Sequence, residues 1–263
     1  MAILMQKNLP SSHWYRRDGS PCHEVFKADG ESVRATTLAD ARKLHLLPSV
    51  TTIMGVLDKP ALSTWKQKQA ILACVRIPRQ PDEPEDYWMA RVLDAAGEET
   101  SKAADLGTEI HDALETATVT GECSLEMEPY IRPLLDWMQE SDIVLTGREL
   151  PVVSPSEGYA GRVDAFFTDS KGCLGILDYK TRKTKPKDKI APYDGQAMQL
   201  AAYAAAHYGV EDLPTVRALN VYISSTEPGR FHVHQHDDIA AEYSAFLAVC
   251  HIWRHAKGYD PRS

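Results

Sequence analysis

The stretch GRVDAFFTDSKGCLGILDYKT, from Gly161 to Thr181, constrains the fold of this chain more than any other segment. Its pattern predicts a β-hairpin that carries Asp164 on one strand and Asp178 with Lys180 on the next. Strand side chains alternate with period two, so Asp178 and Lys180 project from the same face. Apolar residues run directly into Asp178, which is typical of a buried central strand whose end opens into a site.

Two carboxylates and a lysine on neighbouring strands form a minimal set of groups for phosphodiester hydrolysis. Carboxylates bind hard divalent cations, which neutralise phosphate charge and acidify a bound water. The lysine can orient that water or stabilise charge on the phosphate. An exposed ion pair is nevertheless the ordinary explanation of a single Asp-x-Lys pattern. The hairpin alone therefore indicates a site without establishing one.

Two helical motifs lie on either side of the hairpin in the sequence. Gly107, His111 and Glu115 are spaced four residues apart, which places them on one face of a helix. Gly107 allows a close approach of backbone, and His111 can reach a metal. Downstream, Gln199 and Tyr203 lie one turn apart on an alanine-rich helix, where they can hydrogen-bond a phosphate or stack on a base. Each motif alone has a structural explanation, but their order along the chain favours a functional site.

The motif order GxxxH, acidic strand, GxxD, DxK and QxxxY resembles that of the RecB-type branch of the PD-(D/E)xK nuclease superfamily. Similar proteins include the mitochondrial genome maintenance exonuclease. The segment from Leu47 to Gln67 also resembles the amino-terminal part of stand-alone and phage-type exonucleases of this branch. The resemblance implies an α/β fold. The implied fold consists of a PD-(D/E)xK, restriction-endonuclease-like core with a mixed sheet, together with an N-terminal helical region.

The resemblance also implies roles for individual residues. The expected catalytic residues are Asp164, Asp178 and Lys180, and the expected metal ligands are His111, Asp164, Asp178 and the main-chain carbonyl of Tyr179. The substrate-side positions are Ser49, Gln199 and Tyr203. Glu149 matches an acidic position at the rim of the family's site, and it would support the metal ligands together with Glu115.

The expected cofactor is Mg²⁺ or Mn²⁺, as one ion or two. Several relatives also carry an iron–sulfur cluster, which needs four suitably spaced cysteines. The cysteines here are scattered, and only the last lies near the carboxyl end, so we predict no iron–sulfur cluster; they stand at positions 22, 74, 123, 173 and 250. The histidines at 232, 234 and 236 alternate on one strand face, but such a row is more often solvent-exposed than metal-binding.

The formal net charge of −8 argues against broad, non-specific coating of DNA. Positive charge is concentrated directly after the Asp-x-Lys strand, between Lys180 and Lys189. We predict that Arg182, Lys183 and Lys185 in this segment contact phosphate, and a solvated loop is the alternative. Trp65, which is followed by two nearby lysines, could stack on a single strand or pack between helices.

With 263 residues and 43% hydrophobic content, the chain can form a single nuclease domain over 1–263. We expect residues 1–140 to form a hairpin and helical region that covers the cleft, and 141–263 to form the catalytic core. A proline-rich, acidic stretch at 77–86 is the best linker candidate. Expected helices span 37–46, 87–117, 128–140, 194–208 and 239–256, and expected strands span 143–153, 159–168, 173–180, 216–224 and 230–236.

The sequence also bounds the compartment and the partners. Scattered cysteines suit a reducing compartment, and we expect no signal peptide, no membrane association and a cytoplasmic protein. The predicted partners are DNA, preferentially its single-stranded ends, and a recombination or replication protein.

The predicted activity is that of a metal-dependent DNA exonuclease in recombination, repair or replication. Two alternatives stay open. One is a structure-specific endonuclease on the same core, and the other is a catalytically silent DNA-binding subunit.

Overall fold

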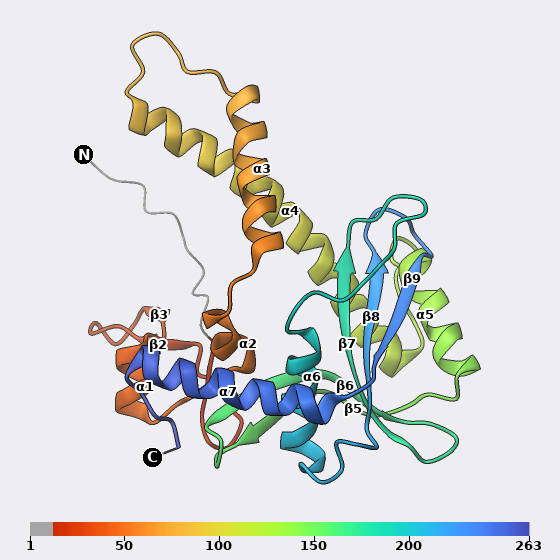
Figure 1. Cartoon of the computed structure of the whole chain (residues 1–263). Coiled ribbons are helices and arrows are strands. Elements are labelled where there is room, and N and C mark those ends of the chain that lie inside the picture. Colours follow the sequence, from red (N-terminus) through yellow and green to blue (C-terminus); the bar gives the residue numbers. More distant parts are fainter. Residues whose placement is uncertain (1–12, 263) are drawn as a thin grey trace.

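A five-stranded mixed sheet forms the centre of the molecule (Figure 1). The computed structural model describes residues 13–262, apart from the side chains of residues 99–105. The sheet order is β5-β6-β7-β8-β9, and neighbours are antiparallel except for the parallel pair β7 and β8. The strands are β5 (Val144–Ser154), β6 (Tyr159–Thr168), β7 (Leu174–Arg182), β8 (Arg217–Ser224) and β9 (Phe231–His236). The predicted α/β class with a mixed sheet is confirmed.

Helices cover both faces of the sheet. On one face, α6 (Gln196–Tyr208) makes the crossover between the parallel strands and packs with α7 (Ile239–Lys257) over side chains such as Ile176 and Ala218. On the other face, α4 (Glu85–Thr120) and α5 (Glu128–Glu140) pack over a second set of apolar residues. Strand residues therefore alternate between two cores, as expected for a sheet that is buried on both sides.

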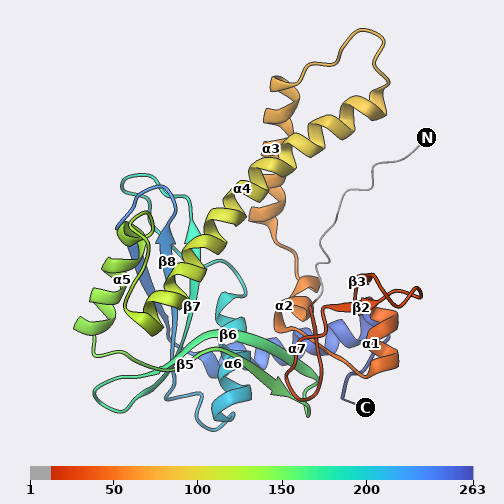
Figure 2. The same ribbon diagram turned by 180° about the vertical axis from the view of Figure 1, so that it is seen from behind.

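The N-terminal region packs beside the carboxyl end of α7 (Figures 1 and 2). Thr37 caps the first helix of this region, because its hydroxyl accepts from the Asp40 amide in a capping box. Two small antiparallel pairs and three short helical segments make up this region. They are β1 (Trp14–Tyr15), β2 (Glu24–Phe26), β3 (Val33–Ala35), α1 (Leu38–Leu44), β4 (Leu47–Pro48), α2 (Val50–Ile53) and the 3₁₀ helix η1 (Met54–Val56).

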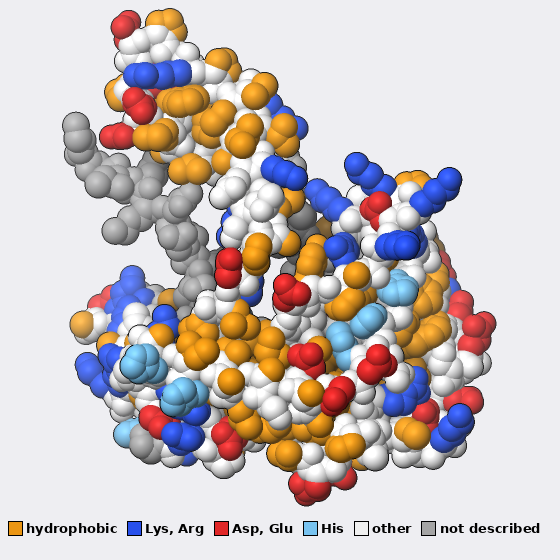
Figure 3. All heavy atoms as spheres, in the orientation of Figure 1, with side chains coloured by type: hydrophobic (Ala, Val, Ile, Leu, Met, Phe, Trp, Pro, Cys, Tyr) orange, Lys and Arg blue, Asp and Glu red, His pale blue; other side chains and the backbone are white. Residues whose placement is uncertain are grey.

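A helical arm projects from the body of the protein (Figures 1 and 2). It consists of α3 (Pro60–Arg76) and the first half of α4, joined by the segment that the sequence indicated as a linker. Ala73 is the buried residue of α3, and apolar side chains such as Ile71 and Val75 are exposed. Figure 3 shows hydrophobic side chains gathered on the surface of the arm. The proline-rich stretch at 77–86 thus connects two helices of the same arm and does not link two domains. None of the described helices is long and apolar enough to cross a membrane.

Candidate metal centre and substrate groove

The candidate site begins where β6 and β7 part. The two strands pair from Ala165 opposite Leu177 to Thr168 opposite Leu174, and the pairing stops before Asp164. There the carboxylate Oδ2 of Asp164 accepts a hydrogen bond of 2.6 Å from the Tyr179 backbone amide. A side chain thus bridges the gap that the main chains leave. The amide and carbonyl of a strand residue face the same neighbour, so the Tyr179 carbonyl also faces this gap.

His111 reaches the gap from α4. Its Nε2 lies 3.1 Å from Asp164 Oδ2, and its ring packs edge-on against the Tyr179 ring. The hydrogen bond to Asp164 is the main reason why the pKa of His111 is raised. One turn earlier, a Cβ on Gly107 would lie 2.6 Å from the Thr181 hydroxyl oxygen. The helix therefore approaches β7 as closely as the GxxxH motif predicts.

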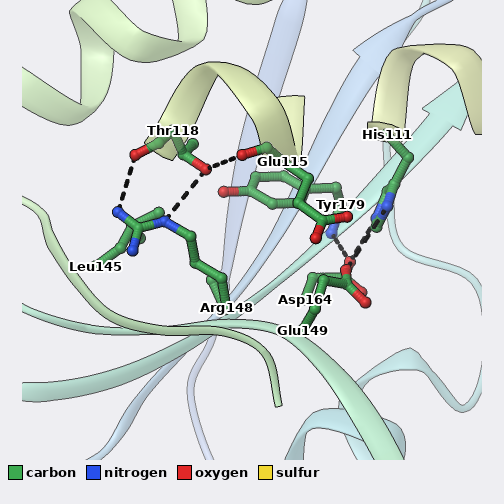
Figure 4. A pocket seen from close by; sticks show the side chains of 9 residues that line it. His111, Glu115, Thr118, Leu145, Arg148, Glu149, Asp164 and Tyr179 are labelled. Carbon is green, nitrogen blue, oxygen red and sulfur yellow. Dashed lines mark hydrogen bonds and ion pairs between the residues drawn. The ribbon is translucent and has the colours of Figure 1, made fainter. Parts of the chain in front are cut away.

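Glu149 completes a cluster of possible metal ligands with His111 and Asp164. One ligand atom from each of these three residues lies within 4.8 Å of the others, and we call this group the cation cluster. Figure 4 shows His111 and Asp164 side by side, with Glu149 on the neighbouring strand. The Glu149 carboxylate also lies 2.6 Å from Arg162 Nε. The sequence places Glu149 only at the rim of the site, whereas in the structure it belongs to the centre.

The backbone of Glu149 explains how its side chain reaches the cluster. Its φ is +48°, in the left-handed region that non-glycine residues rarely adopt. A left-handed residue interrupts the alternation of a strand, and such strain is often found at functional sites. Burial and the nearby charge of Asp164 raise the pKa of the Glu149 carboxyl. A bound cation would relieve this mutual repulsion.

The donor set of the cation cluster fits Mg²⁺ or Mn²⁺. Two carboxylates and one imidazole are ligands that such cations accept, and the Tyr179 carbonyl adds a further oxygen at the strand gap. A cavity of about 10 Å³, lined in part by Glu115 and Tyr179, lies beside the three ligands. This volume is on the order of one water molecule.

Asp178 and Lys180 form a second group, on the face of β7 opposite to the Tyr179 side chain. The Lys180 ammonium lies 2.6 Å from Asp178 Oδ1, and Asp178 is only 3% exposed. Burial raises the pKa of the Asp178 carboxyl, although Lys180 opposes this effect. Burial works against the charge of Lys180, but Asp178 and Asp164 together raise its pKa. The side chains of both residues therefore lie in one electrostatic neighbourhood with Asp164.

Asp178 lies outside the cation cluster, which differs from the predicted ligand set of His111, Asp164 and Asp178. Among the described residues, His111, Glu149 and Asp164 each place one ligand atom within 4.8 Å of the others, so Glu149 takes the place predicted for Asp178. The charge of Asp178 still contributes to the raised pKa of His111, so the two groups are adjacent. The sequence correctly predicts that Asp178 and Lys180 lie on one face of the strand. Of the three ligands in the cation cluster, it predicts His111 and Asp164 but not Glu149.

Gln199 and Tyr203 take different positions, although they lie one turn apart on α6. The Gln199 amide lies 3.5 Å from Asp178 Oδ1 and 3.3 Å from the Tyr203 hydroxyl. Tyr203 is only 4% exposed, and its ring lies where a Cβ on Gly161 would be, 2.4 Å from the nearest ring carbon. Tyr203 is therefore a buried support for Gln199, and the expectation that it contacts substrate is corrected.

Ser49 is a second correction. Its hydroxyl accepts from the Thr52 amide and caps α2, and the residue is 2% exposed. Its backbone also forms an isolated bridge to Ala160 of β6. Ser49 therefore holds the N-terminal region against the sheet and does not face solvent. Thr51, two residues further on, lines the adjacent groove.

A groove of about 830 Å³ leads to Lys180 and Gln199. One set of lining residues comes from α2, η1 and the first turns of α3, and it includes Trp65. The other set follows β7 and includes Arg182, Lys183 and Lys189. The groove therefore brings together the aromatic and the basic features that the sequence left as separate candidates.

The basic residues at the end of β7 and directly after it divide into two groups. The Arg182 guanidinium lies over the Tyr193 ring, 4.4 Å from its centroid, and both residues line the groove. Lys183 also lines it. Lys185 is exposed but is not among the residues that line the groove. Its backbone amide donates a hydrogen bond to the Asp188 carboxylate. The predicted phosphate contact of Lys185 is therefore not supported by its position.

Comparisons with known proteins leave the function to be argued from the site itself. A scan against models of protein families finds no match, and a search of the curated proteins finds none either. Among solved structures, the chain is similar to one described as the crystal structure of SSO0001, at 15% identity and a TM-score of 0.39. The likeness covers 78% of this chain and 90% of that chain. A TM-score at this level carries no argument about fold or function.

Proposed function

We propose that the protein is a metal-dependent deoxyribonuclease with a PD-(D/E)xK-type core. It would act as an exonuclease on single-stranded or frayed DNA ends, in recombination, repair or replication. The observation that carries the proposal is the convergence of His111, Asp164, Asp178 and Lys180 at the gap between two diverging strands. A structural ion pair would account for Asp178 and Lys180, but it would not need the cation cluster next to them.

The roles of the residues follow from their contacts. His111, Glu149, Asp164 and the Tyr179 carbonyl would hold Mg²⁺ or Mn²⁺, and the adjacent Asp178 carboxylate would be a further ligand. A bound cation of this kind supplies positive charge toward a phosphate and makes a nearby water more acidic. Lys180, whose pKa is raised, would stay protonated and direct its charge toward the phosphate or the attacking water.

The groove supports a nucleic acid as the substrate. Its lysines and its arginine match a phosphate backbone, and Trp65 and Tyr193 offer aromatic rings on which bases can stack. Such stacking requires unpaired bases, which agrees with a preference for single strands. Because Lys180 and Gln199 line the same groove, a strand bound there would lie next to the candidate site.

The position of the basic residues predicts a specific salt dependence of binding. Each phosphate contact on a single strand contributes about −0.7 to the slope of log affinity against log salt. Replacing Lys183 and Lys189 by glutamine should therefore reduce the slope by roughly 1.4 and raise KM, with a smaller effect on kcat. Binding is measured in Ca²⁺ instead of Mg²⁺ to limit turnover.

The same segment offers a matched control. Lys185 and Lys187 are exposed lysines that are not among the residues lining the groove. Their replacement by glutamine changes the net charge by the same amount and should leave the slope unchanged. Equal slopes for the two double variants would show that the segment acts only through its total charge.

The experiment that tests the proposed function compares end-labelled linear and circular single-stranded DNA in Mg²⁺. We expect digestion of the linear strand from its end without ATP and resistance of the closed circle. Rapid opening of the circle would favour the structure-specific endonuclease. Binding without cleavage of either substrate would favour the silent DNA-binding subunit.

A further inference from the structure

Asn220 is a buried polar residue that contacts Asp178 from the neighbouring strand. It lies on β8 directly beside Asp178 in the parallel register, and it is 0% exposed. Its side-chain Nδ2 donates a hydrogen bond of 2.8 Å to Asp178 Oδ2. A buried amide is costly unless both of its ends are satisfied. The partner of its carbonyl end therefore matters for the site.

His236, on the edge strand β9, is that partner. Its Nε2 lies 2.8 Å from Asn220 Oδ1. The Asp178 carboxylate can only accept when ionised, so it turns the NH₂ end of Asn220 toward itself and the carbonyl end toward His236. The proton of a neutral His236 ring must then be on Nε2. Burial, with His234 alongside, lowers the pKa of His236 to about 4, so the ring is neutral at physiological pH.

The chain of contacts crosses three adjacent strands, β9, β8 and β7 (Figure 1). Across the β8–β9 ladder, His236 pairs with Ala218, whose small side chain leaves room for the imidazole beside Asn220. His232 lies on the same face of β9 by alternation, but it is exposed, whereas His234 and His236 are half-buried. The three histidines are therefore not equivalent: His236 hydrogen-bonds the buried amide, although His234 is the residue directly opposite Asn220 in the ladder.

We infer that Asn220 and His236 are positioning residues that fix the orientation of the Asp178 carboxylate beside Lys180 and the cation cluster. Asn220 donates to Oδ2, Gln199 approaches Oδ1, and the Lys180 ammonium contacts both oxygens, so the carboxylate is held from several sides. Groups that orient metal ligands in this way commonly change metal affinity or activity by about 10- to 100-fold when removed. The inference rests on the proposed function, because it assigns Asp178 a part in cation binding and hydrolysis.

The test compares Mn²⁺ affinity, measured by the electron paramagnetic resonance signal of free Mn²⁺, with kcat and KM on single-stranded DNA. His236→Leu should weaken Mn²⁺ binding and lower kcat, each by about 10-fold or more, with little change in KM for DNA. His236→Gln should restore most of both, because the glutamine amide can donate from nearly the same position as Nε2. His232→Leu, on the same face of the same strand, is the control and should behave as wild type.

Two results would overturn the inference. One is wild-type Mn²⁺ affinity and kcat in a folded His236→Leu variant. The other is a loss in His236→Gln as large as that in His236→Leu, which would mean that ring packing rather than the hydrogen bond matters. Because Mn²⁺ binding is read without DNA, a protein that binds Mn²⁺ but cleaves nothing would remove the proposed function alone. A wild-type protein that binds no Mn²⁺ would overturn both.

Discussion

Replacing Asp178 by asparagine should reduce cleavage of single-stranded DNA by about 10³-fold or more, because the site loses the carboxylate that pairs with Lys180. Asp164→Asn should have a comparable effect, since Asp164 joins the cation cluster to the Tyr179 amide. Lys180→Ala should also abolish cleavage, and His111→Ala should reduce it through weaker metal binding. The measurement is the initial rate of nucleotide release from an end-labelled strand in Mg²⁺.

The stability of Asp178→Asn provides an independent check. Burial raises the pKa of Asp178 in the folded protein, which means that the ionised form is less favourable there than in the unfolded chain. The ionised carboxylate therefore lowers the free energy of unfolding. This destabilisation is fully present at a pH above the raised pKa and disappears at a pH below the ordinary pKa of an aspartate. The asparagine variant should therefore melt at the same or a higher temperature at neutral pH. Asp112→Asn, an exposed change next to His111, should alter neither activity nor melting temperature.

Glu149→Gly should lower Mn²⁺ affinity and activity by about 10- to 100-fold while leaving the fold intact. The substitution removes one ligand of the cation cluster, but glycine adopts the observed φ of +48° without strain. Relief of a left-handed conformation is worth about 1 kcal/mol, so unfolding in urea should require an equal or higher midpoint concentration. Loss of the Arg162 contact acts in the opposite direction, but this pair is partly exposed and weak.

Glu115→Gln is the matched control for Glu149. Both carboxylates line the small cavity beside His111, but Glu115 is exposed on α4 and is not part of the cation cluster. The resemblance implies a supporting role for Glu115, but its exposed position outside the cluster does not favour that role, so Glu115→Gln should change activity little. If Glu149→Gly retained wild-type Mn²⁺ affinity and activity, Glu149 would be an ion-pair partner of Arg162 and nothing more.

The sequence predicts the central sheet well because its signals are local. Alternation along β6 and β7 follows from the pleat of a strand, and the same-face relation of Asp178 and Lys180 follows from it directly. His111 is correctly directed toward the sheet because the glycine one turn earlier permits close packing. These features need no knowledge of which strands become neighbours.

The features that sequence reasoning missed depend on non-local geometry. Glu149 reaches the cluster through a left-handed backbone angle, which an acidic residue in a strand-like segment does not reveal. Asn220 gave a weak signal, as a polar residue within the apolar run ALNVYI, but its partners lie on two other strands. The resemblance implies that Ser49 and Tyr203 contact the substrate, and only the packing of the N-terminal region and α6 shows that both are buried.

The measurement that tests the central claim most directly is cleavage of one labelled single-stranded oligonucleotide by the wild-type protein in Mg²⁺ and in EDTA, with Asp164→Asn as a parallel sample. We expect a ladder of shortened products in Mg²⁺, none in EDTA, recovery when Mn²⁺ is added back, and none from the variant. Equal cleavage by the folded variant, or cleavage that persists in EDTA, would contradict the assignment of the cation cluster and of the metal-dependent nuclease.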